Sequence, residues 1–176
     1  MYIPISLNQF CINKFTVALA NVYFSLGSNL GDRERNIAEA LRLMDEAFGC
    51  HYSALSSVIE TDPVGFSGER FLNAAVLYRM SAESPLWTLY QVKSIERELG
   101  RTDQPEYDAV GNRVYHSRPI DIDILFYGKE TIDIPELTIP HKGIAGRPFV
   151  MVPLLEIARP SLKKAFPEYF VVKPKE

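Results

Sequence analysis

Apolar residues follow two different periods along this chain, and these periods place the first elements. Val22–Leu26 is a short run of apolar and aromatic residues that ends at Gly27, which predicts a buried strand. From Asp32 to Phe48 the apolar positions recur every three or four residues, which predicts a helix capped by Asp32 and ended by Gly49. A strand followed by a helix is therefore expected first.

The next segments repeat this order with one extra strand. Tyr52–Glu60 is rich in β-prone residues, and Phe71–Met80 is typical of a longer strand. An apolar stripe with helical spacing runs from the capping residue Ser84 to Gly100, and Ile120–Tyr127 begins with strict alternation. The order β-α-β-β-α-β predicts an α+β fold of the ferredoxin-like kind, in which two helices pack on one face of an antiparallel sheet.

Additional elements are expected around this core. A short strand pair near Thr131–Thr138 and a helix from Pro148 to Ala158 should follow it. We assign residues 1–20 to an N-terminal extension and residues 21–176 to a single domain. The connection between Gly100 and Arg118 is long for a compact domain, so it is either disordered or a functional loop. The arginines near its two ends, Arg101 and Arg118, favour a moving lid.

Composition narrows the class of protein. The chain has 176 residues and a mass of 20.0 kDa, with 47% apolar and 23% charged residues, as in ordinary globular domains. Its net charge of −3 argues against nucleic-acid binding through bulk charge, and no apolar run approaches the length of a membrane span. Cys11 and Cys50 are far apart and fit no zinc or disulfide pattern. We expect a cytoplasmic monomer without nucleic-acid or membrane partners.

Asp121 and Asp123 are the clearest candidates for chemistry. Residues i and i+2 of a strand share a face, so both carboxylates should project together while Ile120, Ile122 and Ile124 enter the core. At about 7 Å their charges repel by roughly 2.4 kcal/mol if the effective dielectric constant is about 20. A divalent cation would reverse that sign, and oxygen ligands favour Mg²⁺ over zinc. Two ordinary solvated acids remain the alternative.

Basic residues surround this strand in the predicted loops. Guanidinium groups suit phosphate oxygens, and acidic metal ligands beside arginines are typical of phosphoryl transfer. Each cation could instead pair with a neighbouring acid, so both interpretations stay open. The basic residues are Arg101, Arg113, Arg118, His141, Lys142 and Arg147.

Two further segments are candidates for ligand binding. Phe71 and Asn73 share a strand face and could hold a flat heterocycle between an aromatic ring and an amide, although core packing is the alternative. The stretch Gly27–Asp32 is neither a P-loop nor a dinucleotide-binding motif. A tight turn capped by Asp32 is the better interpretation, because that carboxylate would occupy the anion site at the helix end.

Several segments together resemble the 6-hydroxymethyl-7,8-dihydropterin pyrophosphokinase family of folate biosynthesis. They occur in family order over about residues 22–160, and the last two together are highly specific. They are SLGSNLGDRERNI (Ser25–Ile37), ETDPVG (Glu60–Gly65), FLNAAV (Phe71–Val76), RPIDIDILFYG (Arg118–Gly128) and LTIPHKGIAGRPFVMVPLLEIA (Leu137–Ala158).

The resemblance implies that the pyrophosphoryl group of ATP passes to the hydroxymethyl oxygen of the pterin, releasing AMP. It implies two Mg²⁺ ions held by Asp121 and Asp123. The catalytic residues it implies are Arg101, Arg118, Asp121 and Asp123; the pterin-binding residues are Thr61, Val64, Phe71, Asn73 and Phe149; the ATP-binding residues are Ile124, Leu137, Thr138, His141 and Arg147. Glu96 matches a family position, where a buried charge would need a partner such as Arg101.

The chain also departs from the family pattern. The loop over residues 102–117 is longer than expected and lacks a tryptophan and several arginines, for which Tyr115 and Arg113 are the candidate replacements. Lys142 stands where the family often has an aromatic residue. Two other functions compete with the pyrophosphokinase: a magnesium-dependent phosphohydrolase and a non-catalytic ferredoxin-like binding module. A hydrolase would not need the two aromatic segments, and a binding module would not need the aspartate pair.

Overall fold

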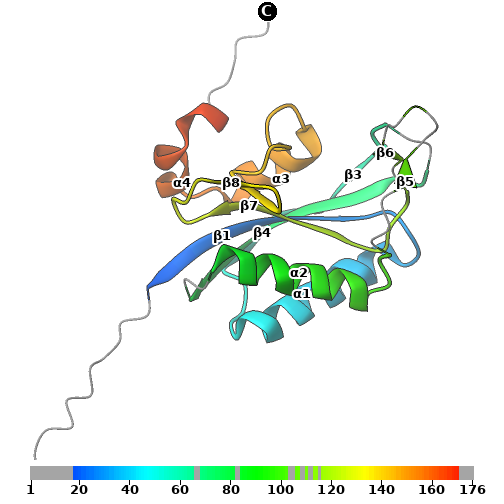
Figure 1. The fold of residues 1–176 in the computed structure, drawn as a ribbon, viewed down its shortest axis with the longest axis horizontal. Coiled ribbons are helices and arrows are strands. Elements are labelled where there is room, and N and C mark those ends of the chain that lie inside the picture. The colour runs from blue at the N-terminus through cyan, green and yellow to red at the C-terminus, as the bar shows by residue number, and fades with distance from the viewer. Residues whose placement is uncertain are drawn as a thin grey trace, which may run out of the picture.

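A five-stranded antiparallel sheet lies at the centre of the molecule (Figure 1). The computed structural model describes residues 18–65, 68–81, 84–102, 106–107, 110, 113–114 and 116–170. The core elements are β1 (Leu19–Ser28), α1 (Arg33–Phe48), β2 (Ala54–Leu55), β3 (Ile59–Thr61), β4 (Phe71–Ser81), α2 (Pro85–Glu98) and β7 (Asp121–Tyr127). The strand order is β2-β4-β1-β7, and β3 also pairs with β4. This order confirms the predicted ferredoxin-like α+β fold.

Strand β1 is the central strand, because it pairs with β4 on one side and with β7 on the other. Its residues are buried on both faces of the sheet. Val22 and Phe24 belong to the core beneath α1 and α2, whereas Tyr23 belongs to a second core on the opposite face. A strand with two buried faces appears in the sequence as a continuous apolar run, which is the pattern that predicted this one.

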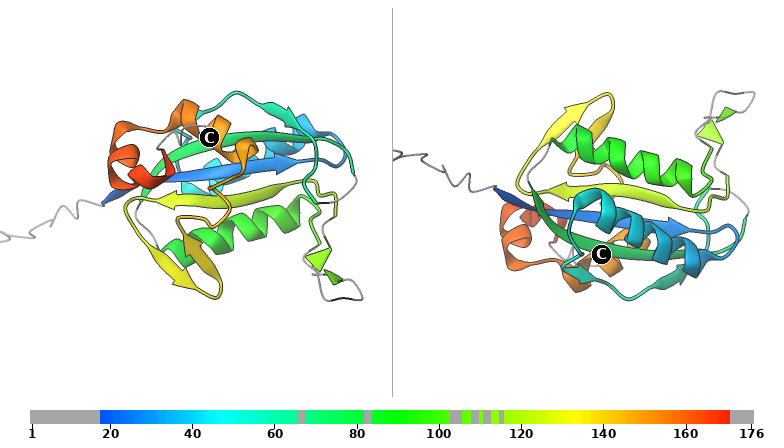
Figure 2. Two further views of the ribbon diagram at one scale, coloured as in Figure 1. Left: turned by 90° about the horizontal axis from the view of Figure 1, so that it is seen from above. Right: turned by 90° about the horizontal axis from the view of Figure 1, so that it is seen from below.

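The two long helices begin and end where their capping residues indicate. The Asp32 carboxylate accepts the backbone N–H of Arg35 at 3.0 Å, and Gly49 ends α1 in the left-handed conformation. Helix α2 has Pro85 in its first turn and is followed by Gly100 with φ of 91°. Both helices cover the same face of the sheet (Figure 2, right).

Further elements cover the opposite face and one edge of the sheet. They are the β8–β9 hairpin (Ile132–Ile134 and Leu137–Ile139), α3 (Pro148–Ile157), α4 (Pro160–Ala165) and the 3₁₀ helix η1 (Pro167–Tyr169). The hairpin and α3 agree with the sequence predictions. We did not predict α4; its six residues are too few to show a helical period, and it packs through Leu162 against the second core (Figure 2, left).

Three sequence predictions concern segments that the described residues cover only in part. The long loop carries two short paired strands, β5 (Glu106–Tyr107) and β6 (Arg113–Val114), whereas Tyr115 lies outside the described residues. Leu19 and Ala20, assigned to the extension, are the first residues of β1, and residues 1–17 lie outside the description, so the domain division stays a prediction. None of the described helices combines the length and apolar character that a membrane span requires.

Candidate active site

The aspartate pair lies on β7, at the edge of the sheet. Ile120, Ile122 and Ile124 are 0%, 1% and 3% exposed, whereas the side chains of Asp121 and Asp123 are 27% and 30% exposed. The alternation predicted for this strand is therefore confirmed. Because Ile122 and Ile124 belong to the core beneath α1 and α2, the alternating side chains of Asp121 and Asp123 lie on the opposite face of the sheet.

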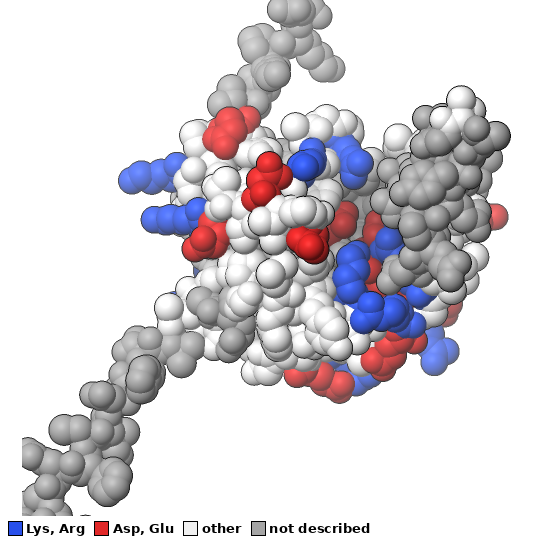
Figure 3. Space-filling view, in the orientation of Figure 1, with Lys and Arg blue, Asp and Glu red and all other residues white. Residues whose placement is uncertain are grey.

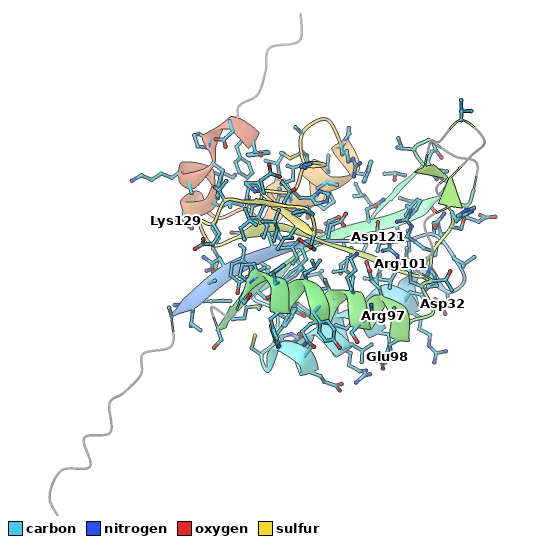
Figure 4. All side chains as sticks on the ribbon, in the orientation of Figure 1. Asp32, Arg97, Glu98, Arg101, Asp121 and Lys129 are labelled. Atoms are coloured by element: carbon cyan, nitrogen blue, oxygen red, sulfur yellow. The ribbon has the colours of Figure 1, made fainter. Side chains whose placement is uncertain are left out.

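Asp121 is held by two arginines. Its Oδ1 contacts Nη1 of Arg101, and its Oδ2 accepts from Nη1 of Arg118 at 3.0 Å. Burial works against ionisation of Asp121, but the charges of Arg101 and Arg118 outweigh it and hold the pKa below its ordinary value. Figure 4 shows Arg101 and Asp121 close together, while Arg97 and Glu98 of α2 point away from them. The arginines predicted at the two ends of the loop therefore converge on one carboxylate.

Asp123 lies in a different electrostatic environment from Asp121. Nε2 of His141 lies 3.9 Å from its Oδ1. Burial and the neighbouring charge of Asp121 raise the pKa of Asp123, and the charge of His141 opposes this only in part. Because its charged form is disfavoured in this way, the Asp123 carboxylate would be stabilised by a nearby cation.

The buried carboxylate of Glu96 holds Arg101 and the backbone of β7 in place. Glu96 is 0% exposed; its Oε1 accepts from Nη1 of Arg101 at 2.6 Å and from the backbone N–H of Ile122 at 2.7 Å. Its Oε2 accepts from Nζ of Lys93 at 2.8 Å. Burial raises the pKa of Glu96, while the charges of Lys93 and Arg101 oppose the shift. The expected partner Arg101 is confirmed; Lys93 was missed, although its spacing of three residues from Glu96 on one helix was the available signal.

A cavity of about 320 Å³ opens beside the aspartate pair. All five residues that the resemblance assigns to the pterin line it: Thr61, Val64, Phe71, Asn73 and Phe149. Arg118, Asp121, Asp123 and Arg147 line it as well. The amide Nδ2 of Asn73 donates to Oγ1 of Thr61 at 2.9 Å, which fixes the amide orientation and leaves Oδ1 as the acceptor on its other side. Phe71 and Phe149 come from β4 and α3, on separate elements of the same cavity.

The turn after β1 anchors the segment that carries Arg118. Asn29 is completely buried; its Nδ2 donates to the carbonyl of Glu69 at 3.1 Å and to Oγ of Ser117 at 3.0 Å, and its Oδ1 accepts the backbone N–H of Arg118 at 2.8 Å. This residue was missed. A single asparagine in a turn carries no sequence signal for a partner 89 positions away.

A second cavity of about 210 Å³ lies between α2, β7 and the β8–β9 hairpin. Four of the residues assigned to ATP line it: Ile124, Leu137, Thr138 and His141. The fifth, Arg147, lines the first cavity instead, and its guanidinium lies 6.0 Å from the centre of the Phe149 ring. Asp123 lines both cavities, so they meet at this carboxylate. A group of blue Lys and Arg side chains lies on the right of the molecule in Figure 3.

The orientation of His141 is set by its own turn. The backbone N–H of Gly143 donates to Nδ1 of His141 at 3.0 Å. Since Nδ1 is an acceptor, the proton of the neutral ring resides on Nε2, the nitrogen that faces Asp123. His141 can therefore donate a hydrogen bond toward the junction of the two cavities even when it is uncharged.

The donor set fits a hard cation shared with a phosphorylated substrate. Among the described residues, no group of three or more histidine, cysteine, aspartate or glutamate side chains is arranged to hold a metal ion by itself. Mg²⁺ commonly takes one or two carboxylates and completes its shell with water and substrate phosphates. Asp121 and Asp123 supply those carboxylates, and the raised pKa of Asp123 indicates a group that a cation would stabilise.

Comparison with known proteins adds to this geometry. Residues 23–159 match the family model described as 7,8-dihydro-6-hydroxymethylpterin-pyrophosphokinase. The chain is 44% identical over 142 residues to a 2-amino-4-hydroxy-6-hydroxymethyldihydropteridine pyrophosphokinase of Porphyromonas gingivalis, covering 80% of this chain and 92% of the relative. It is 37% identical over 144 residues to a protein of the same name in Bacillus subtilis, covering 81% of each.

A longer relative occurs in a plant. The chain is 44% identical over 137 residues to the mitochondrial folate synthesis bifunctional protein of Pisum sativum, covering 77% of this chain and 25% of the relative. This chain therefore spans about a quarter of the length of that plant protein and most of the length of the two bacterial ones.

Proposed function

The chain belongs to the 7,8-dihydro-6-hydroxymethylpterin-pyrophosphokinase family, and from that premise we propose how its site carries out the reaction. The pyrophosphoryl group of ATP is transferred to the hydroxymethyl oxygen of 6-hydroxymethyl-7,8-dihydropterin, which yields AMP and the pterin diphosphate. The observation that carries this proposal is the meeting of two cavities at Asp123. A transfer between two bound substrates requires such a junction, because the attacking oxygen must reach the phosphorus within about 3–3.5 Å.

The first cavity would hold the pterin. Phe71 and Phe149 would stack on the two faces of the ring system, and the Oδ1 of Asn73 would accept from its polar edge. Backbone groups near Thr61 and Val64 would complete the recognition of that edge. This arrangement would leave the hydroxymethyl group free to point toward the aspartate pair.

The second cavity would hold the nucleotide. Ile124, Leu137 and Thr138 would line the adenine and ribose pocket, and the triphosphate would extend from there toward Asp123. His141 would donate from Nε2 to a phosphate oxygen, and Arg147 would approach the phosphates from the first cavity. Arg101 and Arg118, which pair with Asp121 in the structure, would neutralise charge on the transferred group.

Asp121 and Asp123 would hold two Mg²⁺ ions. Bound there with ATP, the ions would neutralise phosphate charge and align the β-phosphorus with the attacking hydroxyl. The carboxylate of Asp121 would be shared between these ions and the two arginines, and Glu96 would hold Arg101 in place. We further propose a cytoplasmic monomer; sedimentation of the purified protein and fractionation of cells test these two points.

The test of the function is the production of AMP with and without the pterin. The protein is incubated with ATP and magnesium, alone or with 6-hydroxymethyl-7,8-dihydropterin, and AMP and pterin diphosphate are separated chromatographically. AMP formation should depend on both the pterin and magnesium. Asp123→Ala should abolish turnover, whereas Glu130→Ala, which removes an exposed acid in the turn after β7, should keep it. Equal AMP release without the pterin would show a hydrolase instead.

A further inference from the structure

Gly143 occupies a buried position where the backbone does not need a glycine. Its φ angle lies outside the positive range that disfavours side chains, unlike that of Gly146 in the same turn. An alanine could therefore adopt the same backbone conformation. What the absence of a side chain provides at this position is therefore space around the missing Cβ.

That space is filled by a guanidinium. A Cβ built on Gly143 would lie 2.5 Å from Nη1 and 2.9 Å from Cζ of Arg147, and 3.0 Å from Cε1 of His141. At Gly27, by contrast, the atom nearest to such a Cβ is Oδ1 of Asn73, at 3.4 Å. The guanidinium of Arg147 thus packs directly on the backbone of Gly143.

The turn around Gly143 is tied down on both sides and has little freedom to yield. The backbone N–H of His141 donates to the carbonyl of Leu125 in β7 at 3.0 Å, and the N–H of Ile144 donates to the carbonyl of His141 at 3.1 Å. Ile144 is 0% exposed and belongs to the second core. Arg147, by contrast, is exposed, and its guanidinium is the end of a long, flexible side chain. If a methyl group were added at position 143, the arginine would move and the turn would stay.

We propose that Gly143 is a positioning residue for the nucleotide: its missing side chain seats the guanidinium of Arg147 between the His141 turn and the Phe149 ring. In this seat the charge borders the first cavity, 6.0 Å from the centre of the Phe149 ring and beside the turn of His141, which lines the second cavity. The inference rests on the proposed function, because it takes the phosphates of ATP as the group that Arg147 meets. Gly143 itself contributes no contact to the reaction.

The test measures binding of a non-hydrolysable ATP analogue with magnesium by calorimetry, using the full chain. Gly143→Ala should weaken binding about tenfold, which is the usual effect of losing one charge-assisted hydrogen bond to a phosphate. The urea midpoint of unfolding should stay unchanged. Ala145→Ser, which adds one atom at an exposed position of the same turn, should bind like the wild type. Arg147→Ala is the reference for loss of the guanidinium.

The decisive comparison is the double variant. If Gly143 acts through Arg147, the Gly143→Ala change should cost nothing further in the Arg147→Ala background. Undiminished loss in that background would overturn the proposal, since another group such as His141 would then be responsible. Unchanged affinity of Gly143→Ala, or its failure to fold, would overturn it as well. A wild-type chain that does not bind the analogue would instead refute the proposed function.

Discussion

The charge of the Asp123 carboxylate should lower the stability of the metal-free protein, and the same charge should be needed for binding of the magnesium nucleotide. Its carboxylate is largely buried next to the charge of Asp121, and its pKa is raised by burial and by that neighbour. Asp123→Asn keeps the shape and removes the charge. The variant should therefore be more stable than the wild type without magnesium, and it should fail to bind the magnesium nucleotide.

The size of the effect follows from the strand geometry. Two unit charges about 7 Å apart repel by roughly 2.4 kcal/mol at an effective dielectric constant of about 20. Arg101 and Arg118 neutralise part of the Asp121 charge, and the Asp123 side chain is 30% exposed, so the repulsion is reduced. A gain of about 1 kcal/mol remains, which corresponds to a rise in Tm of roughly 2–4 °C for a chain of this size.

The dependence on pH has a definite sign. Because the pKa of Asp123 in the folded state is raised above its unfolded value, the carboxyl is protonated in both states at low pH and costs nothing. As the pH rises above the ordinary pKa of an aspartate, the carboxyl ionises in the unfolded state before it does so in the folded state, so the cost grows until the pH passes the raised pKa. The stability advantage of Asp123→Asn should therefore be near zero at about pH 3 and should increase with pH until it levels off above the raised pKa.

Thermal unfolding in EDTA, repeated with magnesium and a non-hydrolysable ATP analogue, measures both effects. Ligand at a hundred times its Kd should stabilise the wild type by about 2.7 kcal/mol and leave Asp123→Asn unchanged. Glu130→Gln is the matched control, since Glu130 is an exposed acid in the turn after β7 and borders neither cavity. The reasoning is refuted if Asp123→Asn is no more stable than the wild type in EDTA, or if the analogue still stabilises it.

Three further changes test the remaining parts of the site. Glu96→Ala should lower the free energy of unfolding by about 3 kcal/mol, because it removes the buried acceptor that Lys93, Arg101 and the backbone N–H of Ile122 share; a loss below about 1 kcal/mol in urea unfolding would contradict this. Phe71→Ala should raise the pterin Kd at least tenfold and leave nucleotide affinity unchanged, as judged by calorimetry with each ligand. Asn29→Ala should cost about 2 kcal/mol of stability and weaken nucleotide binding, because it releases the segment before Arg118; an effect on stability alone would argue against that link.

Local patterns were enough to predict most of the elements that build the core, although Tyr52–Glu60, expected as one strand, forms the two short strands β2 and β3. The alternation over Ile120–Ile124 correctly assigned two aspartates to the open face of a strand, and Asp32 and Gly49 marked the ends of α1. These features depend on residues within one or two turns of each other, so the sequence shows them directly. Helix α4 was missed because six residues are too short to display a helical period.

Resemblance to a family supplied candidate residues whose grouping the structure then displayed. Thr61, Phe71 and Phe149 were named from separate segments, and they line one cavity. Arg147 was named with the ATP residues, yet it borders the cavity of the pterin set. The sequence contains no information on which side of the junction a long side chain rests, because that depends on the space left by its neighbours.

By itself, then, the sequence determined the order of strands and helices, the face of β7 that carries the carboxylates, and the family. Only the tertiary structure decided that Asn29 holds the segment before Arg118, that Lys93 and Arg101 share Glu96, and that Gly143 leaves room for a guanidinium. The physical reason is the separation along the chain between the residues that interact. A period or a cap is fixed by neighbours along the chain, whereas these contacts form only after the whole sheet and its covering helices have packed, since no single residue pair can offset the entropy of bringing distant segments together.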